Sequence, residues 1–224
     1  MSREPAIDAD KFLACLEPLL ACRDLKGLSE VLKARFTDQQ VTALFTHANP
    51  DVRKVAALAF SFCGSRCGLE KLAPLLQDPD PVVNQMAEHA MWSVWFRSGA
   101  NCDANRELCR GTKALNQRDF EGALAHIDRA IGCDPEFAEA YNQRAIVRYL
   151  QERYEESIED CRRVVERMPL HFGAWAGMGH CHAHLGRLTD ALACYEKALS
   201  INPHYECVRQ AVEELRKRDH QHDD

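Results

Sequence analysis

No apolar run in this sequence of 224 residues approaches the roughly 20 residues that a membrane-spanning helix needs. Positive charge is also scarce, because 28 lysines and arginines stand against 34 acidic residues and no basic stripe gathers along the chain. We therefore expect neither nucleic acid nor a membrane surface as a partner. Motifs of phosphate loops, nucleophile elbows and zinc proteases are absent as well, so nothing in the sequence supports an enzyme or a cofactor.

Paired cysteine spacing is missing too, although the chain contains 11 cysteines. They are scattered and lie mostly within expected helices, so we interpret them as reduced core residues of a cytoplasmic protein. The segment from Phe12 to Cys22 is apolar, but Glu17 and Pro18 interrupt it. We therefore expect no secretory signal at the N-terminus.

What the sequence does contain is one unit repeated three times. Pro135, Pro169 and Pro203 stand 34 residues apart, and the residues between them repeat in kind. Small residues recur at this spacing in two columns, and bulky residues recur in two others: Gly111, Ala145 and Gly179; Ala123, Ser157 and Ala191; Phe120, Tyr154 and Leu188; Ile127, Cys161 and Tyr195. Such columns keep paired helices in register when the units stack on one another.

These units resemble the tetratricopeptide repeat (TPR) family, whose repeat length is 34 residues. The third unit is nearest to the family pattern through Trp175, Gly179, Gly186, Ala191, Tyr195, Ala198 and Pro203. The second unit has Tyr141 in place of the tryptophan, and the first has Glu107 there. The resemblance implies an all-α fold, an α-solenoid of stacked antiparallel helix pairs. We place the repeats at 104–137, 138–171 and 172–205, followed by a capping helix over 206–219 and a polar tail over 220–224.

Within the repeats, breaks between the paired helices are marked by polar or glycine-containing segments near 116–119, 151–153 and 186–187. The prolines that close each unit stop its second helix. The pattern therefore predicts helices near 104–116, 120–133, 138–151, 154–167, 172–185 and 188–201.

The first hundred residues follow a different pattern. Two turns rich in Asp and Pro, 49–53 and 79–83, lie 30 residues apart, and each precedes a long helical run. Asp and Pro supply what a helix start needs, an acceptor for free amides and a fixed backbone angle. The segment 37–98 resembles HEAT-type helical repeats, although shorter bacterial-type units fit equally well. We therefore predict a HEAT-like region over 1–100, in which 11–22 and 25–36 form an N-terminal cap or a degraded repeat.

The densest aromatic cluster of the chain lies where the two halves meet. Trp92, Trp95 and Phe96 precede the first TPR unit by about eight residues. These side chains could line a ligand pocket, but large aromatics are more often core residues. We interpret them as the core of a packed junction between the two halves.

The TPR resemblance implies that the first helix of each unit lines a concave surface that binds a partner. Carried over by the register, the predicted groove residues are Leu108, Thr112, Glu139, Asn142, Ile146, Tyr149, His180 and His184. We expect Asn142 to be the main polar anchor, because its amide can both donate and accept a hydrogen bond. Ile146 and Tyr149 would supply apolar contact, and the two histidines a pH-sensitive edge. The alternative is that these residues simply face water.

Two other side-chain patterns allow sharper hypotheses. His180 and His184 have the spacing of a helical metal pair, but no third or fourth ligand is visible, so we predict no metal. Arg144 and Arg148 share a helix face and could hold a carboxylate or phosphate. Acidic residues crowd the same region, and we expect internal ion pairs instead.

The charge pattern of the groove also bears on the ligand class. In the family, a carboxylate clamp that binds the C-terminal tails of heat-shock proteins needs Lys, Asn, Asn, Lys and Arg at fixed positions of three repeats. Here the corresponding residues are Leu108, Thr112, Gln143, Gly173 and Gly177, so every basic residue of the clamp is missing. We therefore predict a non-enzymatic adaptor or scaffold that binds another protein or peptide, with a co-chaperone or assembly factor lacking the clamp as the alternative. Weak self-association through solenoid ends and a metal-dependent or enzymatic role are the remaining alternatives.

Overall fold

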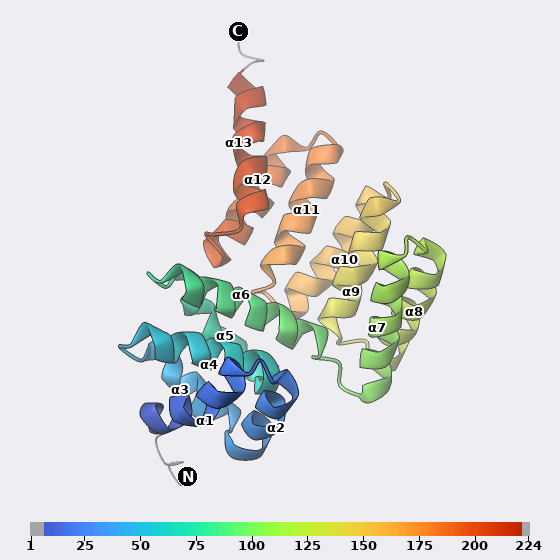
Figure 1. The fold of residues 1–224 in the computed structure, drawn as a ribbon. Helices are drawn as coiled ribbons and strands as arrows, with labels where there is room; N and C mark the ends of the chain where they lie inside the picture. The colour runs from blue at the N-terminus through green and yellow to red at the C-terminus, as the bar shows by residue number, and fades with distance from the viewer. Residues whose placement is uncertain (1–6, 221–224) are drawn as a thin grey trace. The chain divides into compact units, whose positions relative to one another are not determined.

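The computed structural model describes residues 7–220, which form helices and short 3-10 turns without a strand. The chain divides into two compact units, the first ending at Trp95 and the second starting at Phe96. No helix among the described residues is long and apolar enough to cross a membrane. The predicted all-α fold class is confirmed, and Figure 1 traces the order of the helices.

From residue 7 onward, the first unit contains six α-helices joined by short turns. Their bounds are α1 (Ala9–Ala21), α2 (Leu25–Arg35), α3 (Asp38–Ala43), α4 (Pro50–Cys63), α5 (Leu69–Leu72) and α6 (Pro81–Phe96), with 3-10 turns η1 (Leu44–Thr46), η2 (Arg66–Gly68) and η3 (Ala73–Gln77). Aromatic side chains pack edge to face inside the unit, Phe12 on Phe36 at 5.1 Å and Phe45 on Phe60 at 5.4 Å between ring centroids. These contacts contribute to the apolar core.

The turns rich in Asp and Pro begin helices, as the sequence predicts. The Asn49 side chain accepts a hydrogen bond from the Asp51 amide at the start of α4, and Asp80 accepts one from Val82 at the start of α6. Arg53 of α4 then reaches across to the second turn, where its Nε and Nη2 donate to the two carboxylate oxygens of Asp78 at 2.7 and 2.8 Å. This bidentate pair fixes α4 to the segment that leads into α6.

At the end of the first unit, Trp95 is buried and its ring contacts that of Trp92 edge to face at 4.9 Å. Phe96 is 37% exposed. The packed junction around these aromatics stays a prediction.

The second unit is a series of helix pairs followed by a single helix. The pairs are α7 (Cys102–Asn116) with α8 (Phe120–Cys133), α9 (Ala138–Leu150) with α10 (Tyr154–Arg167), and α11 (Phe172–His184) with α12 (Leu188–Ile201); α13 (Glu206–His220) follows them. Each helix begins and ends within two residues of its predicted bounds. Of the predicted tail, residues 221–224 lie outside the described chain, and His220 is the last residue of α13.

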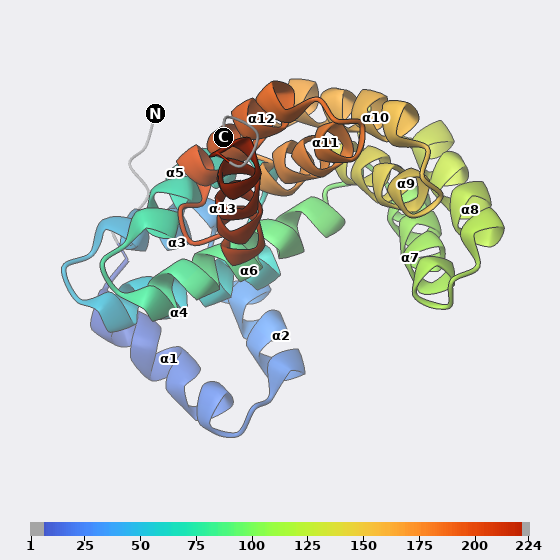
Figure 2. The same ribbon diagram turned by 90° about the horizontal axis from the view of Figure 1, so that it is seen from above.

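Figure 2 shows how these pairs stack: α7, α9 and α11 form the inner row of the arc, and α8, α10 and α12 form the outer row. The columns of small residues explain the close approach within each pair. A Cβ on Gly111 would collide with Ile127, and one on Gly179 would collide with Tyr195. In the second repeat the Ser157 hydroxyl donates to the Ala145 carbonyl at 2.8 Å across the same interface.

The turn inside each pair has the same backbone geometry. Arg118, Glu152 and Gly186 occupy one position of the repeat, and their φ angles are 60°, 61° and 72°. A left-handed residue after a helix end lets the following amide bond back to the last turn. Accordingly, the Asp119 amide donates to the Ala114 carbonyl at 3.0 Å, and the Arg153 amide donates to the Arg148 carbonyl at 2.9 Å.

Candidate functional site

One register position that we expected on the groove wall is buried in all three repeats. Leu108, Asn142 and Ala176 occupy it, and they are 1%, 3% and 2% exposed. Leu108 packs in an apolar core cluster that includes Phe137 and Ala140, so this position faces the next repeat rather than the concave side. The assignment of Leu108 to the groove wall is therefore wrong.

Glu139 and Asn142, also predicted as wall residues, are engaged inside the protein. The Oε1 atom of Glu139 accepts from the amide nitrogens of Asn142 at 3.0 Å and Gln143 at 2.7 Å. Its Oε2 atom lies 2.9 Å from Nε2 of His171, and both side chains are fully buried. The Asn142 side chain is buried and its amide already donates to Glu139. We therefore no longer expect Asn142 to be the polar anchor for a ligand.

The buried Glu139 is matched to one tautomer of His171. The Nδ1 atom of His171 accepts from the Ala174 amide at 3.0 Å in the first turn of α11, so the ring proton sits on Nε2 and is donated to Glu139. The histidine thus caps α11 and connects it to α9. The sequence pattern missed this contact because 32 residues separate the two side chains and His171 reads as a linker residue.

A set of partly or fully exposed side chains begins about one turn after this buried position on the inner helices α7, α9 and α11. We call them the inner stripe, which consists of Thr112, Leu115, Asn116, Ile146, Tyr149, Leu150, His180, Ala183 and His184. All are partly or fully exposed, and Ile146 and Leu150 are 38% and 50% exposed. The stripe contains five of the eight predicted groove residues, and none of its members is Lys, Arg, Asp or Glu.

Aromatic and imidazole rings join the second and third repeats at this stripe. The Tyr149 hydroxyl lies 2.9 Å from Nε2 of His184, and the Tyr154 ring stacks on the His184 ring at 4.8 Å with 9° between the planes. Burial raises the pKa of Tyr149, with a further contribution from Tyr154. We did not predict Tyr154 as a site residue. Its position as the first residue of α10, directly after the turn that follows Tyr149, is a sequence signal that could have indicated it.

His180 is held by a second tyrosine. The Tyr195 hydroxyl lies 2.8 Å from Nδ1 of His180, and burial together with the nearby His184 lowers the pKa of His180. Burial also raises the pKa of Tyr195. The phenol therefore stays protonated and the imidazole neutral, so O–H donates to Nδ1 and the ring proton sits on Nε2.

His180 and His184 hydrogen-bond to different side chains and do not converge on one point. Within residues 7–220, no group of three or more His, Cys, Asp or Glu side chains is placed to hold a metal ion. His180 and His184 each use one ring nitrogen on a different tyrosine.

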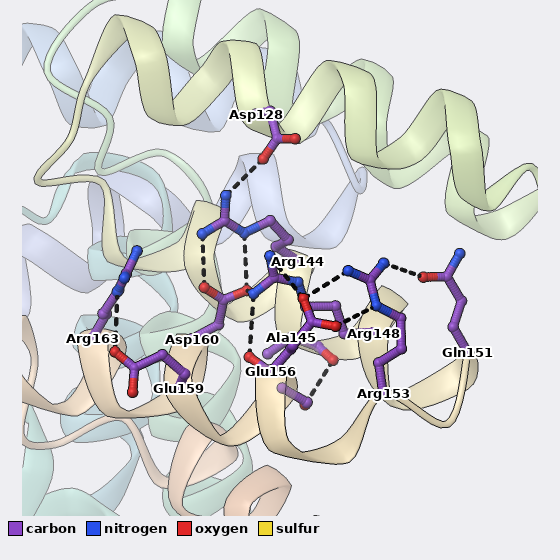
Figure 3. Close-up of polar contacts among 11 residues, drawn as sticks. Asp128, Arg144, Ala145, Arg148, Gln151, Arg153, Glu156, Glu159, Asp160 and Arg163 are labelled. Atoms are coloured by element: carbon purple, nitrogen blue, oxygen red, sulfur yellow. Dashed lines mark hydrogen bonds and ion pairs between the residues drawn. The ribbon is translucent and has the colours of Figure 1, made fainter.

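The predicted internal ion pairs of Arg144 and Arg148 are confirmed. Arg144 donates through Nε and Nη2 to Asp160 at 2.9 and 2.7 Å and through Nη1 to Asp128 at 2.6 Å (Figure 3). Arg148 donates to the same Asp160 carboxylate at 2.7 Å, and this carboxylate is fully buried. Burial works to lower the pKa of Arg144, but the bonds to Asp160 and Asp128 outweigh it and raise the pKa. Both guanidinium groups therefore serve to connect helices.

The first repeat carries a carboxylate where the other two carry an aromatic ring. The Oε2 atom of Glu107 lies 2.8 Å from His126 Nδ1 and accepts from Arg129 Nε at 2.9 Å. These bonds, with His126 contributing most, lower the pKa of Glu107 to about 2. In the second repeat, Tyr141 occupies the position, and the guanidinium of Arg167 lies 5.0 Å from its ring centroid.

Comparisons with known proteins agree with this architecture. Two tetratricopeptide repeat models match the chain at residues 110–169 and 173–205. A TPR repeat-containing protein of Rhizobium etli is 30% identical over 142 residues, which are 63% of this chain and 68% of that protein. The Hsp70-Hsp90 organizing protein of Triticum aestivum is 27% identical over 114 residues, which are 51% of this chain but only 20% of the wheat protein.

A solved structure has the same fold as the second unit. It is the first TPR of Spaghetti (RPAP3) bound to the HSP90 peptide SRMEEVD, with 18% sequence identity and a TM-score of 0.51. The match covers 52% of this chain and 92% of that domain. The predicted TPR repeats are confirmed by the family models and the Rhizobium etli relative, and the chain belongs to the tetratricopeptide repeat proteins.

Proposed function

We propose that this protein is a non-enzymatic adaptor whose inner stripe binds an apolar segment of another protein. The observation that carries the proposal is the exposure of Ile146 and Leu150, which lie one turn apart on α9 and are 38% and 50% exposed. Aliphatic side chains that gather on one exposed face are typical of a surface that a partner covers. An amphipathic helix or an extended peptide with its apolar side turned inward fits such a row.

The charge of the inner stripe supports an apolar ligand rather than an acidic tail. No member of the stripe is Lys or Arg, and burial lowers the pKa of His180. The HSP90 peptide in the related solved structure, SRMEEVD, carries three acidic residues. Such a tail would find no basic partner on this stripe. A co-chaperone role therefore requires a contact other than the carboxylate clamp, although the likeness to the Hsp70-Hsp90 organizing protein keeps that role as our second candidate.

The remaining parts of the proposal concern the first unit and the cell compartment. We infer that the first unit is HEAT-like, supported by its two helix starts rich in Asp and Pro and by the Arg53 bridge to Asp78 between them. We infer a cytoplasmic protein from the free state of the 11 cysteines.

An affinity capture with matched variants tests the inner stripe. The wild-type protein, the double variant Ile146→Glu/Leu150→Glu and the control Leu25→Glu are compared in lysate by quantitative mass spectrometry. Leu25 is 61% exposed on α2 of the first unit, so the control places a glutamate at an exposed aliphatic position outside the inner stripe. We expect partners to be lost from the double variant and retained by the control.

A captured partner is then reduced to its binding segment, and the dissociation constant is measured for all three proteins. Equal dissociation constants for the double variant and the wild type would show that the inner stripe is not part of the interface. Circular dichroism of each variant establishes that the helices are intact.

A further inference from the structure

The geometry points to a small cation-binding pocket beside the inner stripe, where we propose that a Lys or Arg side chain of the partner is held. A cavity of about 280 Å³ lies among α11, α12 and α13. Its walls include His180, Ala183, Tyr195, Ala211, Glu214 and Leu215. The identity of the cation as a partner side chain rests on the proposed function, whereas the pocket itself can be tested without a partner.

Glu214 gives the pocket its charge. Its side chain is exposed on α13, and no side chain of residues 7–217 forms a hydrogen bond or ion pair with it. Two ion pairs elsewhere on α13 do not involve Glu214: Glu206 pairs with Arg209 at 3.4 Å, and Arg216 pairs with Glu196 at 3.8 Å. Glu214 is the one charged residue in the lining of the pocket, so the lining carries a net negative charge.

Aromatic groups form the next part of the wall. The rings of His180 and Tyr195 meet edge to face at 5.2 Å, and the bond between the Tyr195 hydroxyl and His180 Nδ1 holds both in place. A neutral imidazole does not repel a cation, and the faces of aromatic rings attract one. The wall therefore accepts a positive group close to Glu214.

Small and aliphatic side chains complete the pocket. Ala183, Ala211 and Leu215 offer methyl groups, which suit the methylene stem of Lys or Arg while its charged end reaches the carboxylate. An acidic ligand would meet Glu214 with like charge. The pocket therefore selects the opposite charge from the one that a carboxylate clamp selects.

The pocket opens next to the surface that the proposed partner covers. His180 and Ala183 belong both to the inner stripe and to the lining of the pocket. A segment that lies along Ile146 and Leu150 and continues to α11 thus passes the pocket. The predicted ligand is an apolar segment with a basic residue near the end that contacts the third repeat.

A titration with two small probes of the same shape tests the pocket on the full chain. The probes are n-propylguanidinium and the neutral n-propylurea, and the readout is the NMR shifts of the His180 and Tyr195 rings. The proteins are wild type, Glu214→Gln and the control Glu213→Gln, whose residue is exposed on α13 outside the pocket. We expect saturable shifts with the guanidinium in wild type and control, and weaker shifts with the urea.

The charge removed by Glu214→Gln should weaken guanidinium binding by about two- to fivefold, the range of a partly exposed ion pair. Equal affinity of wild type for the two probes, or equal guanidinium affinity of the two variants, would overturn the pocket. Neither result would contradict partner binding at the inner stripe, because that proposal is tested separately by the Ile146→Glu/Leu150→Glu variant. Conversely, a partner that binds the double variant as tightly as the wild type would contradict the proposed function. It would not contradict a pocket that binds guanidinium, whose natural ligand would then be another cation.

Discussion

Tyr149 and His184 are 35 residues apart in the chain, yet the tyrosine hydroxyl lies 2.9 Å from Nε2 of the histidine. The contact joins the inner helices of the second and third repeats at the surface where we place the partner. It fixes the relative position of two groups that a ligand on the inner stripe would touch. A preformed surface loses less conformational entropy when the partner binds.

Removing this hydroxyl should weaken the stacking of the two repeats. We expect Tyr149→Phe to lower the free energy of unfolding by about 0.5–1.5 kcal/mol, the usual worth of one hydrogen bond. Urea denaturation measures the change. Tyr154→Phe is the control, because its ring stacks on His184 and no hydrogen bond of its hydroxyl with a described residue is lost. Equal losses for the two variants would contradict a specific role of the Tyr149 bond.

The stability of the second unit should fall as the solution becomes mildly acidic. Burial lowers the pKa of His180 below its ordinary value near 6.5, so the folded state binds fewer protons than the unfolded state in that range. The contribution is fully present above about pH 6.5 and is lost as the pH falls toward the lowered pKa. Burial also lowers the pKa of His182, which adds to the same trend.

The variant His180→Gln separates the two contributions. We expect its urea midpoint to fall less between pH 7.5 and pH 5 than that of the wild type, with the remaining slope due in part to His182. A slope identical to that of the wild type would show that His180 does not titrate differently on unfolding.

The ion pairs of α10 should differ widely in their contribution to stability. Asp160 is fully buried and pairs with both Arg144 and Arg148, so Asp160→Ala leaves the two guanidinium groups only the half-exposed carboxylates of Asp128 and Glu156. We expect a loss of about 3–5 kcal/mol. The neighbouring pair of Glu159 and Arg163 is about half exposed with 3.6 Å between its atoms, and Glu159→Ala should cost about 0–1 kcal/mol. Thermal or urea unfolding of the two variants checks this order, which similar losses would contradict.

The shared left-handed turn makes a fourth stability prediction. Glu152 adopts φ 61° with a side chain, whereas Gly186 adopts φ 72° without one. Glu152→Gly relieves backbone strain but gives the unfolded chain more freedom, and we expect a net gain of about 0.5–1 kcal/mol. Gly186→Ala should cost about 1 kcal/mol from the backbone alone, because a Cβ there meets nothing within 4 Å. Changes of the same sign in the two variants, measured by urea unfolding, would disprove the argument.

The repeat period predicted the helix bounds and the turns well, because one stacking geometry recurs every 34 residues. Gly111 and Gly179 mark the close approach of paired helices, and the sequence spacing alone locates both. The period also places Arg118, Glu152 and Gly186 in equivalent turns. Features that depend only on position within the repeat are therefore readable from the sequence.

The concave surface was predicted less well, since the register does not say which position of a helix is covered by the next repeat. Leu108 and Asn142 share one such position and are buried, while Leu150 lies one residue beyond the position we chose and is exposed. The bond of His171 to Glu139 depends on side chains that occur in only one repeat. No periodic signal could reveal it.

Ion pairs cross both joints of the repeat array, so both joints respond to ionic strength. Arg144 of the second repeat reaches the half-exposed carboxylate of Asp128 in the first, and Arg187 of the third repeat pairs with the exposed Glu155 of the second at 3.3 Å. Dissolved ions screen both pairs, so rising salt should loosen the two joints together. The packing of the Tyr154 ring on His184 involves no ion pair and should hold the proposed binding surface together at high salt.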